Sequence, residues 1–287
     1  MTVTILQLVV SGVLLGALYA LFASGLTLIW GMMNVVNFAH GDFVMLAMYT
    51  TFVLWKTLGL GPAASVPITA LLMATVGIVV YFALVRHVMR GPMIAQILGT
   101  FGLALFLRYA VFWYFGANFL SLPDNLVGGT FDLGGIRIPS ARLLAGAVAL
   151  LVTVGLHLLL TRTALGSRML AVAEDDVAAQ LMGIKPHQMQ AVAWGLAAGA
   201  TGIAGALIAT FFYISPTVGE TLVIVAFVTV SLGGFGNVPG ALVAGLLIGV
   251  IESLSAYWIG PVYKDIVVYS LFVAVLWLRP QGLMGKM

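Results

Sequence analysis

Long continuous runs of apolar residues dominate the chain, and short polar or glycine-containing stretches separate them. A helix needs about 20 mostly apolar residues to cross the hydrocarbon core of a bilayer. Strands of a membrane barrel would alternate apolar and polar side chains, and these runs do not alternate. The pattern predicts nine helices at about residues 5–30, 35–55, 63–85, 93–115, 141–161, 188–212, 221–234, 238–259 and 262–278.

These runs indicate an all-α membrane protein, a polytopic bundle of about eight or nine transmembrane helices within one domain over residues 1–287. The run at 221–234 is short for a full crossing, so it either crosses or re-enters. The first two runs are separated only by a polar, glycine-containing stretch, so one of them need not cross. Residues 116–140 are expected to be an external loop with turns.

Composition excludes a soluble protein. Hydrophobic residues make up 62% of the chain and charged residues 7%, whereas soluble domains carry about 25% charged residues. The chain has no cysteine, which excludes disulfides and cysteine-ligated metals. We expect the lipid bilayer, not nucleic acid, as its surroundings, and no cofactor or bound metal. The first ten residues are uncharged, so the first run is expected to remain as a membrane helix and not to serve as a signal peptide.

Basic residues predict the orientation, because cytoplasmic loops are enriched in Lys and Arg. If all nine runs cross, the N-terminus is outside and the C-terminus is cytoplasmic. With eight crossings the N-terminus is inside. The nine-span arrangement places seven basic residues on the cytoplasmic side and four outside: Arg86, Arg90, Arg162, Arg168, Lys185, Arg279 and Lys286 against Lys56, Arg137, Arg142 and Lys264.

Enzyme signatures are missing from the sequence. The phosphate-binding motif G-x-x-x-x-G-K-[ST] is absent, and the Lys56-Thr57 pair lacks its glycine. There is also no H-E-x-x-H zinc helix and no G-x-S-x-G nucleophile elbow. We therefore predict no catalytic residue. If transport is driven by ATP, a separate polypeptide supplies the ATPase.

Four ionisable residues lie within the apolar runs: Asp42, Arg108, His157 and Glu252. A charge at the bilayer centre costs roughly 2.5–3.5 kcal/mol on insertion scales, so each is a candidate functional residue. Arg108 and His157 are expected to extend to the interface or to pair with one another. Glu252 follows Gly249 by three residues on a face of small residues, which turns it towards protein. It has either a pathway or gating role or a structural partner.

Two segments interrupt the apolar pattern, at residues 31–43 and 233–240. Interrupted helices at membrane depth are tolerated where they are buried in protein or line a cavity, and paired breaks mark transport paths. Ordinary cytoplasmic turns are the alternative interpretation. The hypothesis for a translocation path names five residues: Asn34, Asn37, His40, Asp42 and Glu252.

The longest polar stretch on the predicted cytoplasmic side is residues 162–187. Its composition predicts a short amphipathic helix over about Arg168–Met182, ended by Pro186. Such a helix between membrane spans is a docking element or lies at the membrane interface.

Three motifs carry a resemblance to a known family. The first runs from Gly25-Leu26-Thr27-Leu28-Ile29-Trp30-Gly31 into Val36–Phe43. The second is Leu165-Gly166-Ser167-Arg168, then Ala171–Asp175 and Ala178 through Leu181–Ile184. The third is Leu232–Ala241 with the ending Leu278–Leu283. Together they resemble the LivH-type permeases, the membrane subunits of branched-chain amino acid ABC importers. The second motif resembles the cytoplasmic EAA loop of such importers, although Asp175 and Asp176 stand where that pattern has two alanines.

The resemblance implies a transporter of several subunits. A second, LivM-like permease would form the path together with this chain, two cytoplasmic ATPase subunits would dock beneath, and a periplasmic binding protein would deliver the amino acid. The helix from Arg168 to Gly183 would be the coupling helix. It would lie in the cytoplasmic loop of this chain at about residues 162–187, and the chain itself would lie in the inner membrane. Its contacts to the ATPase would be Arg168, Glu174, Asp175, Asp176 and Gly183.

Other cargoes and another energy source stay open from the sequence. Permeases similar to this one are associated with urea, short amides or aromatic acids. A secondary transporter driven by an ion gradient would use Asp42 and Glu252 to carry protons or sodium.

Overall fold

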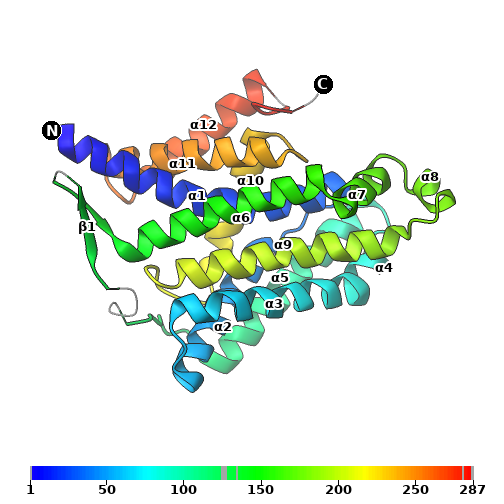
Figure 1. The fold of residues 1–287 in the computed structure, drawn as a ribbon, viewed down its shortest axis with the longest axis horizontal. Helices are drawn as coiled ribbons and strands as arrows, with labels where there is room; N and C mark the ends of the chain where they lie inside the picture. The colour runs from blue at the N-terminus through cyan, green and yellow to red at the C-terminus, as the bar shows by residue number, and fades with distance from the viewer. Residues whose placement is uncertain (1, 124–127, 134, 280, 286–287) are drawn as a thin grey trace.

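The computed structural model describes residues 2–123, 128–133, 135–279 and 281–285, and most of this chain is helical (Figure 1). Lys286, counted above, lies outside the described residues. Each of the nine predicted runs corresponds to one long helix. Their bounds are α1 Thr2–Met33, α2 His40–Leu58, α3 Pro62–Val80, α5 Met93–Phe115, α6 Ser140–Arg162, α9 Pro186–Ile208, α10 Val218–Gly233, α11 Val238–Trp258 and α12 Lys264–Leu278.

Six helical segments of the described chain are long and apolar enough to cross a membrane. They are Val3–Met33, Pro62–Val88, Met93–Phe115, Ser140–Arg162, Pro186–Ile208 and Val238–Trp258. The second of these joins α3 to a short π-helical turn, η1 Tyr81–Val85, and to α4 Arg86–Val88. The prediction of a polytopic helical membrane protein is therefore confirmed, and the count of eight or nine crossings stays a prediction.

Glycines let the helix backbones approach closely where lipid offers no hydrophobic drive for helix association. In the α1–α11 pair, a Cβ on Gly249 would lie 2.3 Å from the Gly12 carbonyl oxygen, and one on Gly16 would lie 2.5 Å from the Gly245 oxygen. The residue numbers rise on one helix as they fall on the other, so α1 and α11 are antiparallel. Gly12 and Gly16 of α1 and Gly245 and Gly249 of α11 thus form packing faces.

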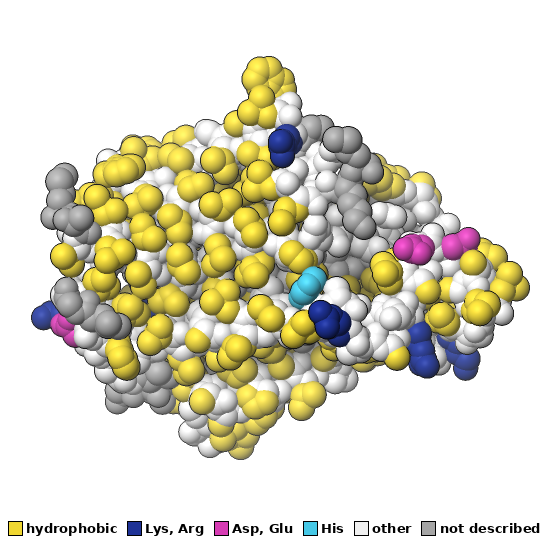
Figure 2. Space-filling view, turned by 45° about the horizontal axis from the view of Figure 1, so that its top comes forward, with side chains coloured by type: hydrophobic (Ala, Val, Ile, Leu, Met, Phe, Trp, Pro, Cys, Tyr) yellow, Lys and Arg dark blue, Asp and Glu magenta, His cyan; other side chains and the backbone are white. Residues whose placement is uncertain are grey.

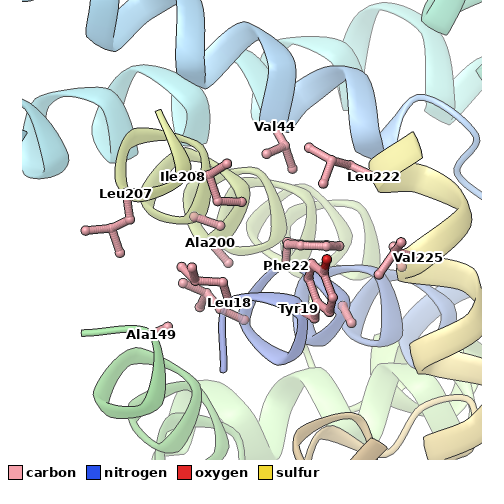
Figure 3. Packing of buried hydrophobic residues seen from close by; sticks show 14 of the residues in the cluster. Leu18, Tyr19, Phe22, Val44, Ala149, Ala200, Leu207, Ile208, Leu222 and Val225 are labelled. Atoms are coloured by element: carbon pink, nitrogen blue, oxygen red, sulfur yellow. The ribbon is translucent and has the colours of Figure 1, made fainter. Parts of the chain in front are cut away.

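A second antiparallel pair, α3 and α9, is built in the same way. A Cβ on Gly77 would meet the Trp194 carbonyl oxygen at 2.6 Å, and one on Gly202 would meet the Thr69 oxygen at 3.0 Å. The buried centre between the pairs is apolar. Figure 3 shows Leu18, Phe22, Val44, Ala200 and Ile208 converging there from α1, α2 and α9.

The two ends of the bundle differ in character (Figure 1). One end, here called the hairpin end, carries the N-terminus and two antiparallel strands, β1 Thr130–Leu133 and β2 Ile136–Pro139. The opposite end, here called the elbow end, carries α7 Ala164–Glu174 and α8 Asp176–Leu181. The strands lie within the segment expected to be a loop with turns, so the all-α prediction missed one small hairpin.

The face in Figure 2 is covered almost throughout by apolar side chains, and most charged side chains gather towards its two ends. This arrangement fits a belt in contact with lipid between two polar surfaces. The helix directions agree with the grouping of basic residues. Arg86, Arg162 and Lys185 lie at or beside helix ends at the elbow end, whereas Arg142 and Lys264 lie in the first turns of α6 and α12 at the hairpin end.

Candidate functional site

The segment between α1 and α2 returns into the bundle before the second helix begins. α1 ends at Met33, residues 34–37 are not helical, and α2 starts at His40. His40 and Ala197 both lie beside Gly25, and Ala197 is the middle residue of α9. The helix α2 therefore begins within the bundle, level with the middle of α9, which agrees with the interpretation of an interrupted helix. Asn34 makes the turn with φ = 53°, in the left-handed region where Asn is tolerated.

Side chains satisfy the backbone within this break. The Asn37 Oδ1 atom accepts a hydrogen bond from the Ala39 N–H at 3.1 Å, and the Thr100 hydroxyl donates to the Val36 carbonyl at 3.0 Å. The His40 Nε2 atom lies 2.7 Å from the Phe22 carbonyl oxygen. Asn37 and His40 are buried. Because unpaired backbone groups are costly at membrane depth, these contacts allow a non-helical segment to exist there.

The first turn of α10 packs directly on the first turn of α2. A Cβ on Gly41 would lie 2.1 Å from the Gly219 carbonyl oxygen, and a Cβ on Gly219 would lie 2.8 Å from the Asp42 Oδ1 atom. No side chain fits at either position. Two helix N-termini thus meet inside the bundle, and each carries an acidic residue in its first turn, Asp42 in α2 and Glu220 in α10.

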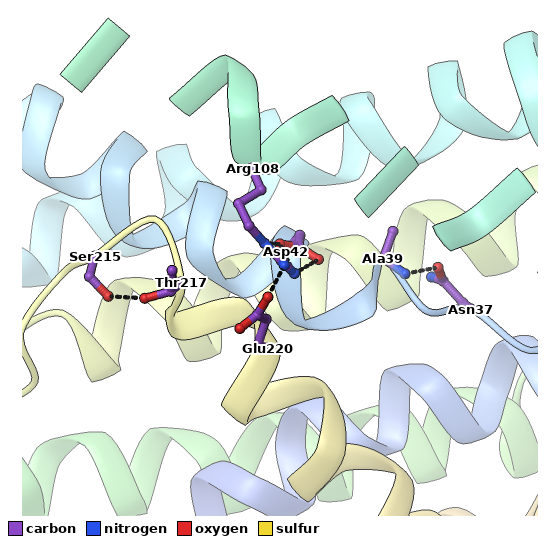
Figure 4. Close-up of polar contacts among 7 residues, drawn as sticks. All are labelled: Asn37, Ala39, Asp42, Arg108, Ser215, Thr217 and Glu220. Atoms are coloured by element: carbon purple, nitrogen blue, oxygen red, sulfur yellow. Dashed lines mark hydrogen bonds and ion pairs between the residues drawn. The ribbon is translucent and has the colours of Figure 1, made fainter. Parts of the chain in front are cut away.

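Arg108 of α5 joins these two carboxylates (Figure 4). Its Nη2 and Nε atoms lie 3.2 and 3.3 Å from the Asp42 Oδ1 atom, and its Nη1 atom contacts the Glu220 carboxylate. The Asp42 side chain is 0% exposed, Arg108 is 12% exposed and Glu220 is 58% exposed. The expectation that Arg108 reaches the interface or pairs with His157 is wrong, because the guanidinium lies between two carboxylates that the helix packing brings to it.

The second predicted break, at residues 233–240, is a turn at the elbow end. The Asn237 Oδ1 atom accepts from the Gly240 N–H at 2.9 Å and begins α11, and the Thr27 hydroxyl accepts from the Gly236 N–H at 2.9 Å near the end of α1. The segment is a short turn between α10 and α11, which agrees with the interpretation of a turn. The pairing of this break with the one at residues 31–43 in a transport path stays a hypothesis, and the first turn of α10 is what packs on the start of α2.

Glu252 has a structural partner. It lies on α11 and is 5% exposed, and its Oε1 atom forms an ion pair with the ammonium group of Lys264, the first residue of α12. The small-residue face of α11 does turn Glu252 inward, as its spacing from Gly249 predicted. Within the described residues, Lys264 is the only cation at ion-pair distance from Glu252.

The predicted cytoplasmic helix is two helices, not one. Asp175 interrupts it with φ = −155°, and its Oδ1 atom accepts from the N–H groups of Val177 and Ala178 at 2.9 Å, which begins α8. The prediction of one helix over Arg168–Met182 missed this N-cap, a preferred role of Asp. Pro186 does not end the segment, since Gly183 turns the chain at φ = 82° and Pro186 lies in the first turn of α9.

The α7–α8 elbow, residues 164–183, exposes both charged and apolar side chains. Arg168 and the acidic residues Glu174, Asp175 and Asp176 are exposed. On α8 and just after it, Val177 is 63%, Leu181 84% and Met182 83% exposed. Figure 2 shows acidic and apolar side chains together on the protruding end at the right. Large apolar side chains beside charges at a protruding tip are typical of a protein-docking surface.

Two features of the site were not predicted from the sequence. Glu220 precedes the 221–234 run and was not singled out, although an acidic residue in the first turn of a helix was a usable signal. The convergence of Arg108 with Asp42 joins residues 66 positions apart, which no local pattern encodes.

Comparison with known proteins gives consistent matches. The family described as "Branched-chain amino acid transport system / permease component" matches residues 8–276. The high-affinity branched-chain amino acid transport system permease protein BraD of Pseudomonas aeruginosa is 32% identical, over 98% of this chain and 96% of its own. LivH of Escherichia coli strain K12 is 28% identical, over 98% of this chain and 96% of its own. LivM of the same strain is 27% identical, over 93% of this chain and 68% of its own. No solved structure matches the chain significantly.

Proposed function

The chain belongs to the family of branched-chain amino acid transport permease components, and we propose that it is the membrane-spanning permease subunit of an ATP-binding-cassette importer. Its cargo is a branched-chain or related hydrophobic amino acid, and its location is the bacterial inner membrane. The observation that carries the proposal is the family match over residues 8–276, in a chain whose helices include six candidate membrane spans.

The proposed topology treats residues 1–287 as one permease domain with nine crossings. It adds α2, α10 and α12 to the six candidate spans, with the N-terminus outside and the elbow end in the cytoplasm. The grouping of Arg86, Arg162 and Lys185 at the elbow end supports this orientation.

The α7–α8 elbow is the proposed coupling element to the ATPase subunits. Exposed apolar residues on α8 would enter a groove of the ATPase, and Arg168, Glu174, Asp175 and Asp176 would form its polar rim. Gly183 would let the chain leave the elbow sharply, since its φ of 82° suits glycine. Closure of two ATPase subunits on ATP would push the elbow and switch the path between inward and outward access.

The proposed assembly contains a second, LivM-like permease subunit, two cytoplasmic ATPase subunits and a periplasmic substrate-binding protein. The similarity of this chain to LivM as well as to LivH supports a pair of related permeases. The path between them would pass the interrupted entry of α2, with Asn34 exposed there and Asn37, His40 and Asp42 shaping its wall. Glu252 would act near its outer end.

Permeases for urea, short amides or aromatic acids remain the competing proposal within this class. The relatives found here are named for branched-chain amino acids, which favours an aliphatic amino acid. A secondary transporter is disfavoured by the same names and by the Arg108 contact of Asp42, which occupies a carboxylate that an ion-coupled mechanism would need free.

Reconstitution tests this function. The chain is co-expressed with its neighbouring permease and ATPase genes, purified as a complex and placed in proteoliposomes with the cognate binding protein. ATP-dependent uptake of L-leucine is expected, with no uptake when ATP is replaced by a non-hydrolysable analogue.

Two elbow variants test the coupling role in the same preparation. Glu174→Lys and Gly183→Trp should leave membrane insertion intact while separating ATP hydrolysis from uptake. Uptake that follows an ion gradient without ATP would contradict the importer proposal, and normal uptake by both variants would contradict the role of the elbow.

A further inference from the structure

A cavity of about 160 Å³ lies between five elements at the hairpin end of the bundle. Its apolar wall includes Leu14, Leu15 and Leu18 of α1. Its charged wall consists of Arg142 at the start of α6, Glu252 of α11 and Lys264 of α12. A cavity lined by aliphatic side chains and by charges of both signs is complementary to a small zwitterion with an apolar side chain.

Arg142 is available to a ligand. Arg142 is exposed, and its guanidinium carbon lies 5.6 Å from the centre of the Phe211 ring, within cation–π distance. Among the described residues, no carboxylate lies within ion-pair distance of Arg142. A guanidinium presents paired donors that match a carboxylate, so Arg142 suits the carboxylate of an incoming molecule.

Glu252 offers the complementary acceptor. Its Oε1 atom is bonded to Lys264. The residue is 5% exposed, and it borders the cavity. A carboxylate has about four lone-pair sites, so Glu252 can also accept a hydrogen bond from an ammonium group that enters the cavity.

The size and the charges select among occupants. A cavity of about 160 Å³ is too small for a peptide, since pockets for drug-sized ligands measure about 300–1,000 Å³. A lipid acyl chain would leave the charged wall unsatisfied, and urea has no carboxylate for Arg142. An anionic lipid headgroup would satisfy Arg142 and Lys264 but would repel Glu252.

We propose that this cavity is an entry site for the amino acid, where Arg142 binds the α-carboxylate, Glu252 binds the α-ammonium group and the α1 leucines contact the aliphatic side chain. The inference rests on the proposed function and deepens it by giving the permease its own selective site on the outer side. The site belongs to this subunit alone and differs from the interrupted entry of α2.

Site-specific labelling tests the site without requiring transport. The chain has no cysteine, so Ser11→Cys places a single thiol at the cavity wall. In nanodiscs containing the whole complex, L-leucine should slow the reaction of this thiol with a membrane-impermeant maleimide. Thr57→Cys, at the exposed outer end of α2, is the matched control and should react at the same rate with and without leucine.

Binding of radiolabelled L-leucine to the same complex provides the second measurement. Arg142→Gln should weaken binding about 10- to 100-fold, the loss expected for one hydrogen-bonded charge. Arg137→Gln removes an exposed basic residue of the same end that lies outside the cavity and should bind like the unmodified protein. Isocaproate, which lacks the ammonium group, and isoamylamine, which lacks the carboxylate, should each compete far less well than leucine.

The outcomes separate this inference from the proposed function. Leucine uptake by the complex, together with unprotected Ser11→Cys and normal binding by Arg142→Gln, would overturn the site and leave the importer function standing. Protection by another zwitterionic amino acid but not by leucine would support the site and overturn the cargo. Protection by urea as strong as by leucine would overturn the zwitterion chemistry.

Discussion

Removing the Arg108 side chain should destabilise the protein strongly, because it would leave the Asp42 carboxylate buried without a cation. The Asp42 side chain is 0% exposed, and Arg108 contacts it at 3.2 and 3.3 Å through two nitrogens. Breaking a buried ion pair by removing one partner costs about 3–5 kcal/mol. We expect a loss of this size in the free energy of unfolding of Arg108→Leu.

A variant of the third group of the network provides the matched comparison. Glu220 is 58% exposed, so solvent or a neighbouring polar surface screens its contact with Arg108. Glu220→Gln should therefore cost at most about 1 kcal/mol, as exposed ion pairs do. The double variant Asp42→Asn/Arg108→Leu should recover much of the loss, since it removes the buried charge together with its partner.

The assay is unfolding of the purified chain in mixed micelles, followed by the fluorescence of its six tryptophans as the denaturing detergent is increased. Arg108→Lys retains the charge and should lose less stability than Arg108→Leu. The reasoning would be refuted if Arg108→Leu lost no more stability than Glu220→Gln, or if the double variant were as unstable as the sum of its single variants.

Three further predictions concern packing and the elbow. Gly249→Ala places a Cβ 2.3 Å from the Gly12 oxygen and should destabilise the chain by about 1–3 kcal/mol in the same unfolding assay. Gly155→Ala, whose Cβ would have no atom within 4 Å, should not destabilise it. Equal stability of the two variants would contradict the packing role of Gly249. Asp175→Ala removes the N-cap of α8 and should lower the stability of this helix by about 1 kcal/mol. The amides of Val177 and Ala178 should then exchange their hydrogens faster. Unchanged exchange would show that the cap does not stabilise α8. Leu181→Ser removes an exposed apolar side chain of the elbow and should reduce co-purification of the ATPase. Leu151→Ser on α6 is the control and should leave co-purification unchanged. Equal recovery of the ATPase with both variants would exclude α8 as the docking surface.

Helix positions were predictable from the sequence because lipid imposes a simple rule on the backbone. A chain in hydrocarbon must satisfy its own N–H and C=O groups, so each long apolar run became a helix. The face of small residues that includes Gly249 was also recognisable in the sequence, since only small residues allow the approach seen between Gly12 and Gly249.

Breaks and partners were harder to predict because they depend on three-dimensional contacts. The start of α2 at His40, not near residue 35, follows from contacts of the break with Thr100 and Phe22. The pairing of Arg108 with Asp42 instead of His157 depends on how α5 lies against α2. The division of the elbow at Asp175 was readable in principle, since Asp is a strong N-cap residue, but the helix-forming residues on both sides concealed it.

The central claim is that the α7–α8 elbow lies on the cytoplasmic side, where an ATPase can bind it. Val177→Cys introduces a single thiol at a 63% exposed position of α8 in a chain without cysteine. In intact cells a membrane-impermeant thiol reagent should leave this variant unlabelled, and in inverted membrane vesicles it should label it fully, with co-expressed ATPase slowing the reaction. Labelling of Val177→Cys in intact cells would place the elbow outside the cell and contradict the account.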